Sequence, residues 1–201
     1  MKKKIILASN SKRRHEILKK VGIAHSIVPS NFDEELIPLT LSVDTYSLEV
    51  AKAKGSIVAK LHPNDFVLSA DTSVYFNKMH LNKPKSLDEA CQMLMNLQGN
   101  QHTVCSAMSL FYKGTCYSAV HKNQVFFKPM NSDWIRYYIT TIDVLDAAGS
   151  YMIDGLSSLF IEKIEGTKES VQGLAIHLFE DLIKQHGGSL CDFTDFSYPL
   201  V

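Results

Sequence analysis

The sequence lacks the compositional features that mark special classes of protein. It contains 10 glycines and 6 prolines among 201 residues, with 45% apolar and 21% charged residues. This is ordinary globular usage, and it excludes collagen-like and disordered chains. Basic and acidic residues number 21 each, so the net charge is zero and no overall field draws the chain to nucleic acid or to an anionic membrane. Any anionic ligand must therefore be held by a local cluster of cations.

Several other signals are missing. Four cysteines without C-x-x-C spacing are too sparse for a disulfide framework and are expected to stay reduced. The lysine-rich start resembles a signal peptide, but the apolar run at residues 5–8 is too short, and no apolar run reaches about 18 residues. We therefore expect a cytoplasmic protein. The absence of G-x-S-x-G, G-x-G-x-x-G and H-E-x-x-H argues against serine hydrolases, dinucleotide binding and zinc.

Hydrophobic periodicity predicts alternating strands and helices, and therefore a mixed α/β fold with at least one antiparallel hairpin. The turn of that hairpin is Lys113-Gly114, and a strand near 66–75 is expected to be interrupted at Asp71-Thr72. The domain is expected to span residues 1–186, followed by a tail at 187–201 with aromatic anchors at Phe193, Phe196 and Tyr198. The other predicted strands lie at 5–8, 26–28, 101–112, 115–128 and 159–164, and the helices follow residue 11 or lie at 42–61, 86–98, 131–141 and 171–186.

A candidate phosphate site lies where the first strand gives way to a helix. The segment contains Ser9, Ser11, Arg13 and Arg14. Free backbone N–H groups and the positive end of the helix dipole gather at such a junction, so hydroxyl and guanidinium groups there suit a phosphate. The alternative is that Ser11 is a simple N-cap and the arginines are solvated. Cations in a first helical turn oppose the dipole, which favours a nearby anion. The segment contains no glycine, so it is not a P-loop.

Two further charged residues, Asp71 and Lys54, lie within apolar segments, where an unpaired charge is costly. Asp71 follows the apolar residues 66–70, and a carboxylate there needs a partner, a hydrogen bond or a metal, unless it only turns the chain. Lys54 lies about 40° from Val50 on the predicted helix, along its buried stripe. Lys54 either extends to solvent or reaches a bound anion.

Two weaker candidates lie nearby in the sequence. Glu34 belongs to an acidic loop and could share Mg²⁺ with Asp71, although acidic runs are normally solvated. Lys83 precedes a predicted capping box and could meet phosphate, although a surface lysine is the commoner explanation.

In combination these motifs resemble the Maf family of nucleoside triphosphate pyrophosphatases, over residues 5 to about 183. The opening segment resembles the family's L-A-S-x-S-P-R-R, with Lys12 where proline is usual. Six matches in the family's order are far more specific than any one of them. They are Leu7-Ala8-Ser9-Asn10-Ser11-Lys12-Arg13-Arg14, Phe32-Asp33-Glu34, Ala51-Lys52-Ala53-Lys54, Ala70-Asp71-Thr72, Lys83-Pro84 and Leu159-Phe160-Ile161-Glu162-Lys163-Ile164-Glu165-Gly166.

The resemblance implies an elongated, twisted mixed sheet flanked by helices, with two lobes and a central cleft, and a homodimer. It implies hydrolysis of a nucleoside triphosphate to the monophosphate and pyrophosphate, with Mg²⁺ or Mn²⁺ as the cofactor. Asp71 would orient or deprotonate water, and Glu34 and Asp71 would hold the metal. Arg14, Lys54 and Lys83 would neutralise the phosphate oxygens, which Ser9 and Ser11 would also contact.

The resemblance also indicates which residues would select the nucleotide base. In the branch that prefers dTTP and UTP, the positions of Arg13, Thr72 and Asp154 hold Arg, Thr and Gln, so only two agree here. A Gln amide both donates and accepts, whereas ionised Asp154 only accepts, so a modified nucleotide is a second possible substrate. Ala147 also replaces a family lysine. A weakly active or non-catalytic nucleotide-binding homologue that regulates cell division is therefore the alternative function.

Overall fold

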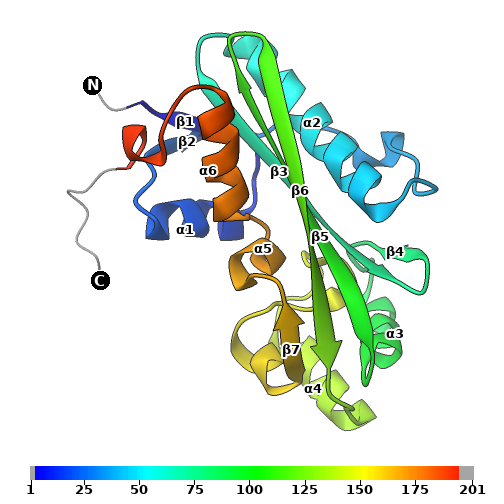
Figure 1. Cartoon of the computed structure of the whole chain (residues 1–201). Coiled ribbons are helices and arrows are strands. Elements are labelled where there is room, and N and C mark those ends of the chain that lie inside the picture. The colour runs from blue at the N-terminus through cyan, green and yellow to red at the C-terminus, as the bar shows by residue number, and fades with distance from the viewer. Residues whose placement is uncertain (1–2, 195–201) are drawn as a thin grey trace. The chain divides into compact units, whose positions relative to one another are not determined.

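The computed structural model describes residues 3–194, and the predicted anchors Phe196 and Tyr198 lie outside this range. The chain is mixed α/β, as predicted, with a seven-stranded mixed sheet whose main path is β2-β1-β3-β5-β6-β7, while β4 pairs with β3 (Figure 1). The strands are β1 (Ile5–Leu7), β2 (His25–Ile27), β3 (Phe66–Phe76), β4 (Met79–Leu81), β5 (Gln101–Tyr112), β6 (Thr115–Phe127) and β7 (Ile161–Glu165). The α-helices are α1 (Lys12–Lys20), α2 (Val43–Leu61), α3 (Leu87–Leu97), α4 (Ser132–Thr141), α5 (Lys168–Gln172) and α6 (Ile176–Gln185). Short 3₁₀ helices are η1 (Glu34–Leu36), η2 (Ala148–Ser150), η3 (Gly155–Leu159) and η4 (Leu190–Asp192).

The chain divides into two compact units, each made of separate segments. Of the described residues, unit 1 contains 3–71, 106–121 and 173–194, and unit 2 contains 72–105 and 122–172. The strands β3, β5 and β6 each contribute residues to both units. The expectation of a single domain of two lobes over residues 1–186, with a tail at 187–201, stays a prediction.

Unit 1 is a sheet covered by helices on both faces. β1 is parallel to β2 and β3, and Leu7 lies opposite Leu68. Ile5 and Leu7 face a core that includes Leu18 of α1 and Phe179 of α6. The alternate residues of β1 face α2, where Ile6 and Ala8 pack with Val58. The helices α1 and α6 therefore cover one face and α2 covers the other (Figure 1).

The predicted anchor Phe193 is confirmed. Its side chain is buried in the unit 1 core, and its ring meets that of Phe66 edge to face, with centroids 5.0 Å apart. A backbone bridge between Ile23 and Thr194 holds this end of the described chain beside β2.

In unit 2, α3 and α4 pack against the residues of β3, β5 and β6 that belong to this unit. Ser86 caps α3 by accepting a hydrogen bond from the Glu89 amide at 3.2 Å, and Asn131 caps α4 in the same way. The core is rich in rings, with Tyr138 against Phe160 at a centroid distance of 5.0 Å. The fully buried Asn123 amide donates to the Val104 carbonyl at 3.1 Å, which satisfies a polar group inside the core.

Three expectations about the elements need correction. β3 runs without interruption through Asp71-Thr72, because pairing with the neighbouring strands continues past the charged residue. The predicted helix at 171–186 is two helices, α5 and α6, separated by Gly173, whose φ of 118° does not fit a helix. The short strand β4 was not predicted, since three residues carry too little periodicity. The long helix, now α2, and the β5–β6 hairpin with its Lys113-Gly114 turn are confirmed.

No helix formed by residues 3–194 combines the length and the apolar character required to cross a bilayer.

The buried His102 of unit 2 makes the stability of the fold depend on pH. Its Nε2 lies 2.8 Å from the Tyr151 hydroxyl, and its Nδ1 is buried without a partner among the described residues. Burial lowers the pKa of His102 from 6.5 to about 3. The unfolded chain therefore binds more protons than the folded chain between these two values. We expect the free energy of unfolding to fall as the pH drops through this window, by up to about 1.4 kcal/mol per pH unit.

Urea denaturation at several pH values measures this effect. The variant His102→Phe removes the titrating ring and should flatten the dependence, whereas His62→Gln, at a histidine of the α2 C-cap, should keep the wild-type slope. An equal slope in wild type and His102→Phe would assign the effect to other groups.

Candidate functional site

The most buried charged cluster of unit 1 joins Glu34, Lys54 and Asp71. The Lys54 ammonium lies 2.7 Å from Glu34 Oε1 and 3.2 Å from Asp71 Oδ1. The side chains of Lys54 and Asp71 are only 12% and 7% exposed, whereas that of Glu34 is 49% exposed. Three candidate residues far apart in the sequence are therefore brought together, with one positive charge between two carboxylates.

Close packing of α2 on β3 positions this cluster. The Ser69 hydroxyl of β3 donates to the Ala51 carbonyl of α2 at 2.7 Å. A side-chain carbon at Gly55 would collide with Phe111 and with the Ser69 hydroxyl, so only glycine allows this approach. Lys54 precedes that glycine, and its side chain reaches Asp71 and not the solvent.

A second polar cluster of unit 1 surrounds Arg14. Its Nη1 donates to the Ser9 hydroxyl at 3.0 Å, and its Nε donates to the Gly173 carbonyl at 2.9 Å. The Ser9 hydroxyl also accepts from the Ser11 amide at 3.2 Å. Arg14 is only 9% exposed, so the alternative of solvated arginines does not apply to this residue. Arg13, the next residue towards the N-terminus, is half-buried.

Strand register relates the two clusters. The Ala8 amide donates to the Leu68 carbonyl at 2.8 Å, directly after the paired residues of β1 and β3. Ser9 therefore follows β1 at the same sheet level at which β3 approaches Asp71. Ser11 is the N-cap residue of α1, but its side chain makes no capping hydrogen bond. The hydroxyls and guanidinium groups of this segment thus stand at a strand end and a helix start, as the sequence predicts.

Three candidate residues belong to unit 2. Thr72 is half-buried on β3. Lys83 is exposed and pairs with Asp146 at 2.5 Å. Asp154 is also exposed; it pairs with Lys168 at 2.6 Å and accepts a hydrogen bond from the Gln172 amide. The Asp154 carboxylate raises the pKa of Lys168. Unit 2 therefore gathers Asp154 with a cation and an amide that sequence reasoning did not select. Ala147 is buried in this unit.

Sequence reasoning also missed Tyr46 of α2. Its side chain is 5% exposed, and burial, followed by the charges of Asp71 and Glu34, raises the pKa of its hydroxyl to about 12. The hydroxyl is therefore neutral beside two carboxylates. Tyr46 lies on the apolar stripe of its helix, where an aromatic residue is indistinguishable from a core residue by sequence alone. Gly173 was missed because it is 159 positions from Arg14, and only the folded chain joins them.

The carboxylates of Glu34 and Asp71 fit a hard divalent ion in part. Both oxygens already contact one cation, the Lys54 ammonium, so the site accepts positive charge between them. Within residues 3–194, no group of three or more His, Cys, Asp or Glu side chains is arranged to hold a metal. Mg²⁺ is commonly bound through one or two carboxylates together with water and phosphate oxygens. The donor set therefore suits an ion that a substrate helps to hold.

Comparison with known proteins identifies the family. Residues 4–186 match the model of the Maf-like proteins, and the chain belongs to this family. A dTTP/UTP pyrophosphatase of Clostridium perfringens strain SM101 is 40% identical over 177 residues, covering 87% of this chain and 92% of that protein. A dTTP/UTP pyrophosphatase of Desulforamulus reducens is 37% identical over 185 residues, covering 91% and 96%.

Among solved structures, the Ham1 protein of Staphylococcus aureus overlaps 62% of this chain and 72% of its own, with a TM-score of 0.44 and 16% identity. An overlap this loose carries no argument about this chain.

The close approach of α2 to β3 leads to a test of how the cluster is held. The variant Gly55→Ala places a methyl group against Phe111 and Ser69, and we expect overpacking to lower the free energy of unfolding by about 1–3 kcal/mol. Urea denaturation measures this change. Ser56→Ala, at the next position of the same helix, is the control and should change stability by less than about 0.5 kcal/mol. Equal stabilities of Gly55→Ala and wild type would show that the helix can move away from the strand at no cost.

Proposed function

We propose that this chain hydrolyses a nucleoside triphosphate to the nucleoside monophosphate and pyrophosphate. The observation that supports this proposal is the cluster of the buried Lys54 and Asp71 with the half-exposed Glu34, in a chain of the Maf-like family. The relatives named above are dTTP/UTP pyrophosphatases, which favours an enzyme over a protein that only binds nucleotides. The metal, the roles of individual residues, a homodimer and a cytoplasmic location are further parts of this proposal.

Cations on the protein would neutralise the substrate. A triphosphate carries about four negative charges, and attack at its α-phosphorus adds charge to the equatorial and leaving oxygens. In unit 1 Arg14 and Lys54 would supply positive charge, and in unit 2 Lys83 would do so. The Ser9 hydroxyl, which already accepts from Arg14, and the Ser11 hydroxyl would contact the same phosphates.

Lys54 and Lys83 now pair with carboxylates, so phosphate binding exchanges one anionic partner for another. Such an exchange limits the cost of desolvating the cations, because they are partnered both before and after binding.

Glu34 and Asp71 would hold the divalent cation, Mg²⁺ or Mn²⁺. When bound, this ion supplies Lewis-acid stabilisation of the phosphate oxygens. Glu34 is half exposed and can adjust its position, whereas Asp71 is fixed in β3 and paired with Lys54. Asp71 is therefore the better candidate for acting on the attacking water, a role that needs exact geometry.

Asp71 would act on the attacking water. It accepts a hydrogen bond from water and takes its proton as the water oxygen bonds to the α-phosphorus. The bond between that phosphorus and the oxygen bridging to the β-phosphorus breaks, and pyrophosphate leaves with the bonding electrons. One water is consumed, and the proton passes from Asp71 to solvent. The pKa of the nearby Tyr46 hydroxyl is raised by burial and by the charges of both carboxylates, so this group stays neutral and would not compete as a base.

Arg13, Thr72 and Asp154 would contact the base. An ionised Asp154 can only accept hydrogen bonds, but it holds the amide of Gln172 and the ammonium of Lys168. The Gln172 amide and the Lys168 ammonium are hydrogen-bond donors beside Asp154, and they compensate for the donor that a Gln side chain would supply there. We therefore keep dTTP and UTP as the proposed substrates, together with modified nucleotides, in a house-cleaning role.

The substitution Asp71→Asn tests the proposed chemistry. It keeps the shape of the side chain but removes its negative charge and basicity, and we expect pyrophosphate release to fall by at least about 100-fold with Mg²⁺ or Mn²⁺. The assay uses a panel of nucleoside triphosphates, including modified bases. Asp65→Asn, at an exposed aspartate just before β3, is the control and should keep wild-type activity. Undiminished turnover by Asp71→Asn would contradict the role of Asp71, and no turnover by wild type on any nucleotide would favour the binding-only alternative.

The substitution Asp154→Gln tests base selection. It replaces an acceptor with a group that both donates and accepts, as the edge of uracil or thymine requires. We expect the ratio of kcat/KM for UTP and dTTP over CTP and GTP to rise on the order of tenfold. Glu162→Gln, at an exposed carboxylate of β7, should leave this ratio unchanged. An unaltered ratio in Asp154→Gln would exclude Asp154 from base selection without affecting the proposed hydrolysis.

A further inference from the structure

Three polar side chains of unit 2 meet at one point of its surface. The Lys168 ammonium lies 2.6 Å from Asp154 Oδ1, and the Gln172 amide donates to Asp154 Oδ2. The two donors therefore contact different oxygens of one carboxylate and lie on either side of it. The side chains of Lys168 and Asp154 are 55% and 53% exposed, so the group is open to a ligand.

A short helix holds both donors on its outer face. Lys168 and Gln172 are four residues apart in α5, which places them on the same side of the helix. Ser170, midway between them, faces the other way, because it is fully buried and its hydroxyl accepts from the Asn123 amide at 2.9 Å. The side-chain carbonyl of Asn123 also accepts from the Thr167 backbone amide at 3.0 Å. The buried face of α5 is therefore tied to β6, and the two donors are turned outward.

The carboxylate of Asp154 is not used by its own helix. Asp154 is the N-cap residue of η3, yet its side chain makes no capping hydrogen bond. An aspartate at an N-cap commonly accepts from the first backbone amides of the helix. Here the carboxylate contacts the two donors of α5 instead. An exposed ion pair stabilises a fold by at most about 1 kcal/mol, so stability gives little reason for this arrangement.

Each of the three groups keeps hydrogen-bonding capacity for a ligand. An ammonium has three N–H donors, a side-chain amide has two, and each carboxylate oxygen has two lone pairs. The contacts within the group use one of these on each atom. Across the group from Lys168 to Gln172, the remaining pattern is donor, acceptor, donor.

The complement of this pattern is the imide edge of a nucleotide base. An imide is an N–H group between two carbonyls, as in uracil, thymine and the purine xanthine, and it presents acceptor, donor, acceptor. Cytosine presents acceptor, acceptor, donor along the same edge. Its ring nitrogen would face the carboxylate, and its amino group would face one of the two donors. Such mismatched contacts add to selectivity as much as the matched ones do.

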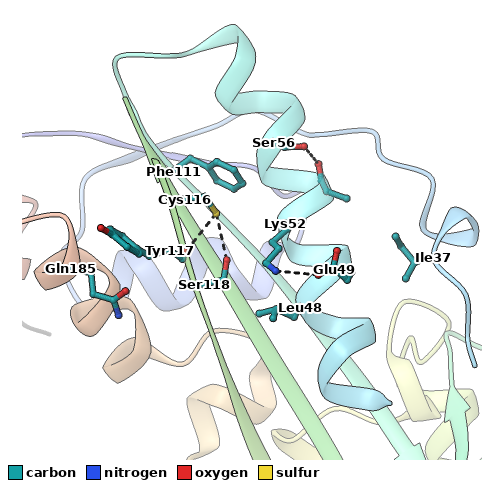
Figure 2. A pocket seen from close by; sticks show the side chains of 11 residues that line it. Ile37, Leu48, Glu49, Lys52, Ser56, Phe111, Cys116, Tyr117, Ser118 and Gln185 are labelled. Atoms are coloured by element: carbon teal, nitrogen blue, oxygen red, sulfur yellow. Dashed lines mark hydrogen bonds and ion pairs between the residues drawn. The ribbon is translucent and has the colours of Figure 1, made fainter. Parts of the chain in front are cut away.

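A pocket of about 650 Å³ in unit 1 is separate from the candidate site residues (Figure 2). It is lined by Lys52 and Glu49 of α2, which pair with each other at 3.1 Å, and by Phe111 and Cys116 of the β5–β6 hairpin. None of the residues assigned above to the phosphates, the metal or the base lines it. Base recognition is therefore sought around Asp154.

We propose that Lys168, Asp154 and Gln172 recognise the imide edge of the base, with Lys168 and Gln172 donating to the two carbonyls and Asp154 accepting from the N–H. The substrate class is then nucleoside triphosphates with an imide-containing base, and it includes xanthine, which a preference for pyrimidines alone would exclude. This inference rests on the proposed function, which assigns Asp154 to the base but gives Lys168 and Gln172 no contact with it.

Binding of substrate analogues tests the inference without turnover. The probes are the α,β-methylene analogues of UTP and CTP, whose P–C–P bridge is not hydrolysed, titrated into the full chain with Mg²⁺ by calorimetry. We expect Gln172→Leu to weaken binding of the UTP analogue on the order of tenfold and not to weaken binding of the CTP analogue. Gln92→Leu, at an exposed glutamine of α3 in the same unit, is the matched control and should bind both as wild type does. Equal affinities of wild type and Gln172→Leu for the UTP analogue would overturn the inference.

A double substitution distinguishes base recognition from a structural role of Gln172. In the variant Asp154→Gln, residue 154 itself supplies a donor and an acceptor. Gln172→Leu should then change the ratio of the two affinities little, whereas it lowers that ratio on the order of tenfold when Asp154 is present. The same loss in both backgrounds would contradict direct recognition by Gln172.

A lysine variant and the hydrolysis assay complete the test. Lys168→Met should lower the affinity ratio in the same direction, and Lys163→Met, at an exposed lysine of β7, should not. Should Gln172→Leu fail to fold, Lys168→Met decides the question. Release of pyrophosphate from UTP with an affinity ratio that none of these variants alters would overturn the inference and leave the proposed function intact. Binding of the UTP analogue that depends on Gln172, without turnover of UTP, would support the inference and overturn the proposed hydrolysis.

Discussion

The buried ion pair between Lys54 and Asp71 is the constraint on which the candidate site depends. A charge removed from water costs several kcal/mol unless a partner and hydrogen bonds compensate, so neither side chain can keep its place alone. With Glu34 included, the three groups carry one net negative charge. The cluster is therefore satisfied as it stands, yet it retains an attraction for a further cation. That combination distinguishes a candidate ligand site from a purely structural ion pair.

The rest of unit 1 holds the members of this pair in register. Asp71 is fixed because β3 continues through it, and Lys54 is fixed because α2 approaches β3 at Gly55. Next to β3, Ser9 directly follows the end of the neighbouring strand β1, and Arg14 of α1 donates to the Ser9 hydroxyl and to the Gly173 carbonyl. Unit 1 thus carries one acidic and one basic group of side chains around the neighbouring strands β1 and β3, which suits binding of a polyphosphate with a metal ion.

Much of this arrangement could be predicted from the sequence, for identifiable reasons. The helix at 42–61 and the hairpin were predictable because long periodic segments and a two-residue turn leave little choice. Lys54 and Asp71 stood out because they are charges within apolar patterns. Tyr46, Gln172 and Gly173 were not predictable, since their roles arise from contacts between distant segments. The break between α5 and α6 was not predicted, because periodicity does not show that the backbone conformation of Gly173 excludes a helix.

The division of the chain into interleaved segments has a consequence for synthesis on the ribosome. All residues of unit 2 have been made by residue 172, but unit 1 still lacks α6 and Phe193 at that stage. The inner faces of β1 and β3, which Phe179 and Phe193 later cover, remain open to water until translation is almost finished. Arg14 likewise waits for the Gly173 carbonyl. The nascent chain therefore carries an apolar sheet face that α1 covers only in part until α6 and Phe193 are made, and this is the surface to which chaperones would bind.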